Sequence, residues 1–330
     1  MTNMAEAQLI ALDWGTTSAR AYLMGRGGEI LAERSKPLGI MQVNRNAEEK
    51  SLVLEVAFGA AFEELCGDWS ETLPLTPIIA CGMVGSRQGW IEAAYRPAPA
   101  DLSTQNLELA TVEVGHGQRL HVIPGVLDSK ELPDVMRGEE TQILGALDLD
   151  TEQSDSEDEQ LFLLPGTHSK WVRVKGQTII DFSTSMTGET FALLSKHSIL
   201  SKLMDPATDE NWNAFDRGVR VSRSSTGSVD VMLTAFSART LVLTGRLERT
   251  EVSDYLSGLM IGSEIRSVIE RWKDREVPAL TICGNQELNK RYARALALFD
   301  VQRVRELQGT AARGLWSVAS TAGLLQASSV

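Results

Sequence analysis

A strand–turn–strand pattern near the N-terminus limits what this chain can fold into. The apolar run Leu9–Leu12 predicts a buried strand, and Arg20–Met24 predicts a second one. Between them lies the tight turn Gly15-Thr16-Thr17-Ser18. Such a turn exposes backbone N–H groups and hydroxyls on one concave side, which is an arrangement that binds anions. Asp13 stands beside the turn and predicts a Mg²⁺ ligand, because Mg²⁺ prefers carboxylate and water oxygens.

The same pattern occurs a second time in the chain. Leu161–Leu164 and Lys170–Val174 predict two strands, and Pro165-Gly166-Thr167-His168-Ser169 predicts the turn between them. Gly15-Thr16 and Gly166-Thr167 are 151 residues apart, and the same interval separates the serines of the two turns. A spaced repeat of this kind predicts a duplicated domain with two phosphate-binding turns.

The remaining pattern alternates strands and helices, which predicts the α/β class. Ala279–Cys283 reads as a strand and Val135–Leu147 as a helix. Seven acidic residues in 148–159 predict a solvated loop, and we place the domain boundary there. The predicted domains are residues 1–147 and 148–330.

Composition excludes several classes of function. The net charge of −12 argues against a nucleic-acid partner, which requires a basic surface. No apolar run has the length of a membrane span, and no signal peptide is evident. The three cysteines are widely spaced and fit a reducing cytoplasm. No GxxxxGK[ST] segment is present, which argues against a P-loop kinase.

Several segments resemble one family of enzymes. DWGTTSAR and PGTHSKW are similar to the two phosphate motifs of the sugar-kinase, actin and Hsp70 superfamily. The narrower resemblance is to the 2-dehydro-3-deoxygalactonokinase family, and it rests on GMVGSRQGWIEAAY (82–95), PDVMRGEETQILGA (133–146), MTGETFALL (186–194) and ICGN (282–285). It implies two duplicated ribonuclease H-like (actin-like ATPase) domains flanking a nucleotide cleft, the first binding a sugar acid and the second adenosine.

The resemblance also implies ATP and Mg²⁺ as cofactors. It assigns the ATP phosphates to Gly15, Thr16, Thr17, Ser18, Gly166, Thr167 and Ser169. His168 and Lys170 either face the γ-phosphate or orient the second turn. Gly284-Asn285 resembles the turn that binds adenosine.

A kinase that acts on an alcohol needs a carboxylate to accept the hydroxyl proton. In related sugar kinases this acid lies just upstream of the second phosphate turn, where many have Gly-Asp. Here the matching residues are Gly138-Glu139-Glu140, so either glutamate is a candidate, and Asp134 is a rival. Arg137 is a candidate anion contact.

The substrate of the resembled family is a 3-deoxy-2-oxo sugar acid, whose carboxylate is best held by an arginine. Arg87 is the candidate, with Ser86 and Gln88 for hydroxyls and Trp90 and Tyr95 as pocket walls.

The sequence therefore predicts a cytoplasmic kinase of a 2-keto-3-deoxy sugar acid. The family resemblance implies that the substrate is 2-dehydro-3-deoxy-D-galactonate and that its 6-hydroxyl is phosphorylated. The alternatives are a kinase for another sugar or sugar acid, such as 2-keto-3-deoxygluconate, and an actin- or Hsp70-like ATPase. The expected partner is a small molecule rather than a nucleic acid or a membrane. The sequence leaves open whether the chain forms a homodimer.

Overall fold

The computed structural model describes residues 4–103, 107–149, 158–207, 209–224, 230–271 and 277–325. The chain forms two compact units. Unit 1 comprises Met1–Asp158, Val174–Asp181 and Gly309–Val330, and unit 2 comprises Glu159–Arg173 and Phe182–Gln308. The segment from Gly309 onward thus belongs to unit 1, whereas the sequence placed all of 148–330 in one domain. Most of the acidic loop expected at 148–159 lies outside the described residues.

The core of unit 1 is a six-stranded sheet in the order β3-β2-β1-β4-β8-β7. β1 pairs antiparallel with β2 and parallel with β4, which in turn is parallel to β8. Leu9–Leu12 are fully buried, as their apolar run predicts. The strands are β1 (Leu9–Trp14), β2 (Ala19–Met24), β3 (Ile30–Lys36), β4 (Ile78–Gly82), β7 (Ala110–Glu113) and β8 (Arg119–Val122).

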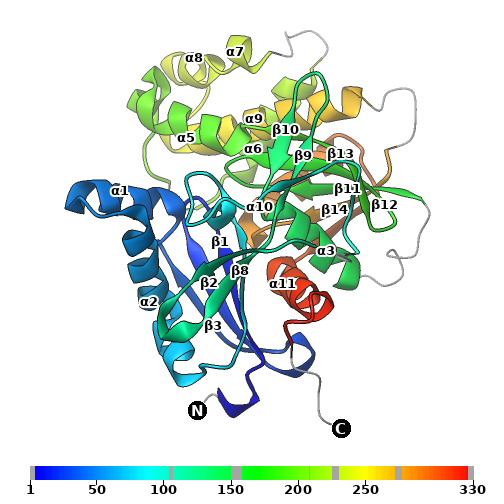
Figure 1. The fold of residues 1–330 in the computed structure, drawn as a ribbon. Coiled ribbons are helices and arrows are strands. Elements are labelled where there is room, and N and C mark those ends of the chain that lie inside the picture. The colour runs from blue at the N-terminus through cyan, green and yellow to red at the C-terminus, as the bar shows by residue number, and fades with distance from the viewer. Residues whose placement is uncertain are drawn as a thin grey trace. The chain divides into compact units, whose positions relative to one another are not determined.

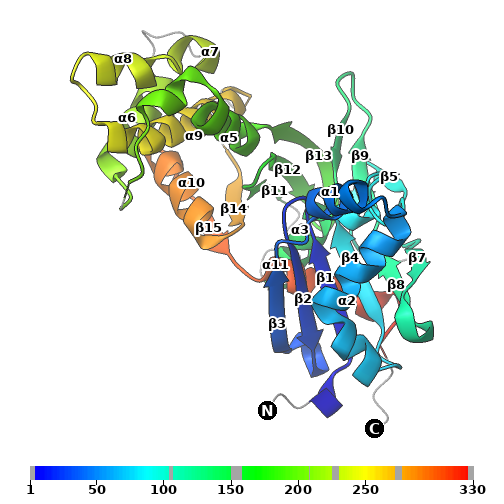
Figure 2. The ribbon, with the colours of Figure 1, turned by 90° about the vertical axis from the view of Figure 1, so that its left-hand side faces the viewer.

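Four helices cover this sheet. α1 (Ile40–Lys50) and α2 (Leu54–Thr72) pack on the cluster that contains Trp14 and Phe58, and Figure 2 shows α2 lying along the strands. α3 (Glu139–Leu149) and α11 (Thr310–Thr321) lie side by side in Figure 1, and α11 contacts β1 and β4.

Short elements complete unit 1. A three-stranded sheet has the order β10-β9-β5. Its strands are β5 (Tyr95–Pro97), β9 (Gly125–Asp128) and β10 (Asp134–Met136), and β6 (Ala100–Asp101) is a further short strand. The 3₁₀ turns are η1 (Met4–Glu6), η2 (Arg26–Gly28), η3 (Met83–Gly85) and η4 (Gly115–Gly117).

Unit 2 repeats the strand plan of unit 1. Its sheet runs β15-β14-β11-β12-β13, which matches β8-β4-β1-β2-β3 position by position. β14 is parallel to both β11 and β15. The strands are β11 (Glu159–Leu164), β12 (Ser169–Lys175), β13 (Thr178–Ser185), β14 (Ala279–Cys283) and β15 (Val304–Leu307). The hairpin tip Val174–Asp181 is counted with unit 1, where Thr178 and Ile179 pair with β6. The predicted duplication and the α/β class are therefore confirmed.

The helices of unit 2 pack on one another as well as on the sheet. They are α5 (Thr187–His197), α6 (Trp212–Arg223), α7 (Val231–Thr234), α8 (Ser237–Leu243), α9 (Val252–Glu270) and α10 (Gln286–Leu298), with 3₁₀ turns η5 (Ile199–Leu203) and η6 (Arg249–Glu251). No helix in the described part of either unit has the length and apolarity that a membrane span requires.

The helix predicted at Val135–Leu147 begins later than expected. Val135 lies in β10, and α3 starts at Glu139. The break is at Gly138, whose φ of 108° is a left-handed conformation that glycine tolerates best. The prediction of a helix start at 135 was thus wrong by four residues.

Glycines allow two helix pairs to cross at very short range. A Cβ on Gly145 of α3 would lie 1.9 Å from the Thr310 carbonyl oxygen, and one on Gly314 of α11 would lie 1.9 Å from the Thr141 oxygen. In unit 2, a Cβ on Gly258 of α9 would lie 2.0 Å from the Phe215 oxygen of α6. These crossings leave no room for even a methyl group.

We expect Gly145→Ala to lower the free energy of unfolding by about 1–3 kcal/mol, because added atoms in a packed contact force the backbone apart. Gly59→Ala is the matched control, since a Cβ there meets nothing closer than 4.0 Å. The control should be neutral or stabilising by up to about 1 kcal/mol through helix propensity. Denaturant unfolding of both variants checks this, and equal stability of the two would contradict the close crossing.

Candidate active site

The first Gly-Thr turn joins β1 to β2 and is fixed by the start of α1. The Gly15 N–H donates to the Ser18 carbonyl oxygen at 2.9 Å, and the Ile40 N–H donates to the Gly15 oxygen at 3.1 Å. A Cβ on Gly39 would lie 2.3 Å from the Thr17 carbonyl carbon. Thr17 at the tip of this turn is exposed.

The second turn is held in the same way. The Glu189 N–H donates to the Thr167 oxygen at 2.9 Å, and a Cβ on Gly188 would lie 2.3 Å from the Gly166 oxygen. Thr167 and His168 are exposed. His168 Nε2 lies 2.5 Å from Glu189 Oε2. Sequence reasoning did not find Gly39 or Gly188, although each is the glycine that follows the third strand of its repeat.

The other two predicted residues of the second turn point into the protein. Ser169 is fully buried, and its hydroxyl lies 2.8 Å from the Tyr292 hydroxyl. Lys170 is also buried, and its Nζ donates to Thr184 Oγ1 at 2.6 Å. Both side chains therefore contact protein in this structure, which favours an orienting role for Lys170, and the assignment of Ser169 to the phosphates stays a prediction.

A third repeated feature lies where β4 and β14 end. Cys81-Gly82 and Cys283-Gly284 occupy corresponding places in the two sheets. A Cβ on Gly82 would lie 2.7 Å from the Trp14 oxygen, and one on Gly284 would lie 3.2 Å from the Pro165 side chain. Each glycine therefore lies against the end of the strand that leads into a Gly-Thr turn.

Asn285 is exposed and caps the start of α10. Its side-chain oxygen accepts the Leu288 N–H at 2.9 Å, which is an N-cap contact. Behind it, Asn289 is fully buried, and neither polar atom of its side chain has a hydrogen-bond partner. Gly284-Asn285 therefore forms a strand-to-helix connection, as expected, with an unsatisfied amide at its base, and its role in binding adenosine stays a prediction.

Acidic groups gather where β1 and β4 end. Asp13 pairs in register with Cys81, whose Sγ lies 3.9 Å from the Asp13 carboxylate. Burial raises the pKa of Asp13, while the charge of Arg20 opposes this. Burial raises the pKa of Cys81 as well, and the charges of Asp13 and Glu140 add to the rise. Asp13 and Glu140 therefore lie in one weakly solvated region.

The two candidate glutamates differ in what they contact. Glu140 is 1% exposed, and its oxygens accept the Gly138 N–H at 3.0 and 2.8 Å. Burial, with the charge of Glu139, raises the pKa of Glu140 to about 7. Glu139 is half-buried, and its Oε2 accepts the Arg137 N–H at 2.9 Å. Asp134 lies in β10, where its carboxylate accepts the N–H of Val135 at 2.8 Å.

The loop after β4 supports the fold more than an open pocket. Arg87 projects into solvent with its side chain 86% exposed, and its Nε lies 2.9 Å from Glu92 Oε1. Ser86 is buried and donates to the Met83 oxygen at 2.8 Å. Trp90 packs against the core of unit 1, with its ring centre 6.1 Å from that of Phe58. Gln88 is exposed.

Two other guanidinium groups lie nearer the acids. Arg137 is 6% exposed, stacks 4.2 Å from the Tyr95 ring centre, and donates from Nη2 to the Ala93 oxygen at 2.8 Å. Its Nε and Nη1 have no hydrogen-bond partner. Arg96 lies near enough to Glu140 to feel its charge, although burial lowers the pKa of Arg96. Sequence reasoning missed Arg96, since no motif marks it.

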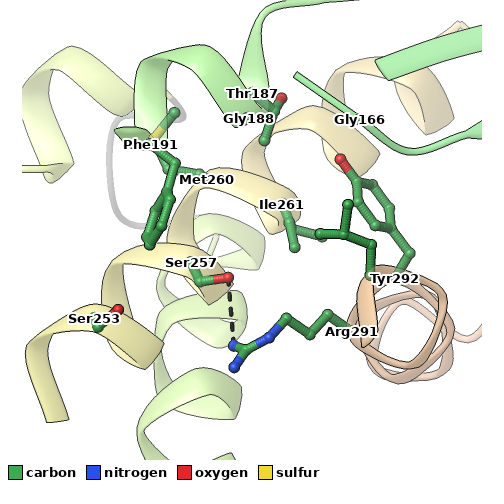
Figure 3. A pocket seen from close by; sticks show the side chains of 11 residues that line it. Gly166, Thr187, Gly188, Phe191, Ser253, Ser257, Met260, Ile261, Arg291 and Tyr292 are labelled. Carbon is green, nitrogen blue, oxygen red and sulfur yellow. Dashed lines mark hydrogen bonds between the residues drawn. The ribbon is translucent and has the colours of Figure 1, made fainter. Parts of the chain in front are cut away.

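Unit 2 contains a pocket beside the second Gly-Thr turn (Figure 3). The pocket has a volume of about 230 Å³ and lies between α5, α9 and α10. Apolar side chains of Phe191, Met260 and Leu288 form much of its wall, with Ser257 and Arg291 as polar groups. Gly166 and Gly188 also line it, so the pocket opens onto the turn itself.

Comparison with known proteins identifies the family. The family model described as 2-keto-3-deoxy-galactonokinase matches residues 13–318. The 2-dehydro-3-deoxygalactonokinase of Escherichia coli (strain K12) is 34% identical over 88% of this chain and 89% of its own. A protein of Rhizobium meliloti (strain 1021), named as a probable enzyme of this kind, is 33% identical over 93% and 97%.

A solved structure agrees with these matches. A crystal structure from Sinorhizobium meliloti, assigned by name to 2-dehydro-3-deoxygalactonokinase, superposes with a TM-score of 0.78 at 31% identity, covering 95% of this chain and 99% of that one. The resemblance seen in the sequence is confirmed, and the chain belongs to the 2-keto-3-deoxy-galactonokinase family.

Proposed function

We propose that this chain is an ATP-dependent kinase that phosphorylates the 6-hydroxyl of 2-dehydro-3-deoxy-D-galactonate. The reaction is assigned from family membership, and one observation in the structure supports the site of the phosphate donor, ATP. The apolar pocket of unit 2 ends on Gly166 and Gly188, so a nucleoside in the pocket would place its phosphates at the second Gly-Thr turn. An apolar cavity with a few polar groups suits a flat base.

The Gly-Thr turns supply backbone N–H groups and hydroxyls for phosphate oxygens. Thr17 in unit 1 and Thr167 in unit 2 are exposed, and they are the hydroxyls that we assign to this role. Phosphoryl transfer depends mainly on positioning and on neutralising charge, so rigid turns suit it.

Glu139 is the residue to which we assign the proton of the sugar hydroxyl. It is half-buried, whereas Glu140 is enclosed and holds the Gly138 N–H with both oxygens. A general base must reach the hydroxyl that it deprotonates. Glu140 therefore shapes the loop on which Glu139 sits.

Mg²⁺ fits Asp13 as a single-carboxylate site. Among the residues that the structure describes, no group of three His, Cys, Asp or Glu side chains could hold a metal alone. Mg²⁺ in kinases usually uses one or two carboxylates together with waters and substrate phosphates, so Asp13 is sufficient on the protein side. When bound, Mg²⁺ neutralises charge on the β- and γ-phosphates.

The carboxylate of the substrate fits Arg137 better than Arg87. Arg87 is solvated and already paired with Glu92, whereas Arg137 is buried with two donors unfilled and lies two residues from Glu139. A buried donor without a partner is costly unless a ligand fills it. We place the enzyme in the cytoplasm, where its three free, buried cysteines stay reduced.

Filling the pocket should weaken ATP binding alone. We expect Ser257→Trp to raise the KM for ATP at least about tenfold, since tenfold corresponds to about 1.4 kcal/mol, while the KM for the sugar acid stays unchanged. Ser267→Trp, on the exposed face of the same helix, is the matched control. A coupled assay and calorimetric titration with ATP check this. Unchanged ATP affinity in Ser257→Trp would show that the nucleotide does not bind in this pocket.

The neighbouring glutamates should respond differently to neutralisation. Glu139→Gln should lower kcat about 10²- to 10⁴-fold, because general base catalysis contributes roughly that much. Glu140→Gln and Asp134→Asn should retain most of kcat. Steady-state rates at saturating ATP and sugar acid decide the assignment. A larger loss in Glu140→Gln than in Glu139→Gln would reverse the two roles.

Substitutions of Arg137 and Arg87 should differ in their effect on the KM for the sugar acid. Arg137→Lys should raise the KM for the sugar acid about 10- to 150-fold, because Lys keeps the charge but cannot grip both oxygens. Arg87→Ala should change it less than about twofold, as expected for an exposed ion pair. The KM for ATP serves as the internal reference. A larger rise in this KM for Arg87→Ala than for Arg137→Lys would assign the substrate carboxylate to Arg87 instead.

A further inference from the structure

A network of buried polar side chains lies behind the second Gly-Thr turn, and the proposed reaction does not use it. Trp171 Nε1 donates to Glu264 Oε1 at 2.7 Å, and the Tyr292 hydroxyl donates to Glu264 Oε2 at 2.7 Å. The Ser169 hydroxyl lies 2.8 Å from that of Tyr292. Thr187 lies 2.7 Å from Ser185, hydroxyl to hydroxyl, and also bonds Glu264. Every residue that bonds Glu264 is less than a tenth exposed.

The chemistry of the partners fixes the direction of the hydrogen bonds. An indole N–H only donates, and an ionised carboxylate only accepts. Burial raises the pKa of Glu264, but hydrogen bonds from four side chains oppose that rise, those of Thr187, Trp171, Tyr292 and Ser169. Because Tyr292 gives its one proton to Glu264, Ser169 gives its proton inward, to the Tyr292 hydroxyl or to Glu264 itself. The hydroxyl proton of the turn is therefore directed inward, away from any ligand.

The network connects two parts of the proposed donor site. Ser169 is the first residue of β12, and it directly follows Thr167 and His168 of the turn. Tyr292 and Thr187 line the pocket, and Figure 3 shows the Tyr292 ring on α10 at the pocket wall. A shift of the Tyr292 ring would thus move both the wall and the anchor of the turn.

We propose that Glu264, Tyr292 and Ser169 form a relay that fixes the second phosphate turn to the wall of the nucleotide pocket. Tyr292 and Ser169 are positioning residues for ATP, and Glu264 acts through Tyr292. Ser169 affects phosphate binding through its buried bonds to Tyr292 and Glu264, and its hydroxyl is not itself a phosphate ligand. The inference rests on the proposed nucleotide pocket. It adds an explanation of how the pocket wall and the phosphate turn keep a fixed position relative to each other.

A double-mutant cycle of Ser169→Ala and Tyr292→Phe tests the relay. Each single variant should raise the KM for ATP about 5- to 30-fold, the range expected when one hydrogen bond in a chain that ends on a carboxylate is lost. The double variant should be no worse than the worse single variant within about twofold, because either change breaks the same chain. The KM for the sugar acid should stay constant. Independent, multiplying effects would overturn the relay and make Ser169 a direct ligand.

Tyr255→Phe is the matched control. Tyr255 is fully buried in α9 of the same unit, and its hydroxyl lies 2.6 Å from that of Ser237. It does not line the pocket. It should lose a similar amount of thermal stability with no change in the KM for ATP. A Tyr292→Phe enzyme that behaves like this control would show the network to be structural only and overturn the proposal.

The Ser257→Trp variant keeps the two proposals distinguishable. If Ser257→Trp weakens ATP binding but Tyr292→Phe does not, the relay fails and the pocket stands. If neither variant changes ATP affinity, measured by calorimetric titration of the full chain with ATP, the pocket assignment fails first and the relay with it.

Discussion

The close approach of a glycine backbone to each Gly-Thr turn is the constraint on which both units depend. Gly39 and Gly188 each follow a third strand, and each would drive a Cβ to 2.3 Å from the backbone of its turn. The helix that starts there then donates its first N–H groups to the turn carbonyls. Those bonds satisfy groups at a helix start that otherwise lack partners, and they leave the outward N–H groups of the turn for a ligand.

The pKa values of the acidic residues in unit 1 are also shifted by close packing. Asp13 and Glu140 lie where strand ends exclude water, so burial raises the pKa of both. Glu140 keeps its place because the Gly138 N–H and the Thr141 hydroxyl bond it. For Glu140, a pKa of about 7 in the folded state against 4.5 unperturbed means that its ionisation costs stability as pH rises through that interval. Such a cost is tolerated where a weakly solvated carboxyl has a use.

The strands and the duplication could be predicted because they depend on local pattern. Leu9–Leu12 and Ala279–Cys283 are apolar runs that end in turn residues, and a repeat needs only spacing. The site residues were harder to predict, because a sequence motif does not show which way each side chain points. Arg87 and Trp90 share one loop, yet one is in solvent and the other is in the core. Arg96 became visible only when the fold brought it near Glu140.

The two copies of the turn show why identical residues at corresponding positions need not have the same role. Ser18 and Ser169 occupy the same position in the repeat, but Ser18 is half-buried and Ser169 is fully buried. Beneath Ser169 lie α9 and α10, which carry Glu264 and Tyr292 and bind its hydroxyl inward. The β-sheet of unit 1 instead packs α1 and α2 through apolar side chains such as Phe58 and Phe62. A duplicated turn thus acquires its chemistry from the helices behind it, and unit 2 has the polar helices that can link the turn to a pocket.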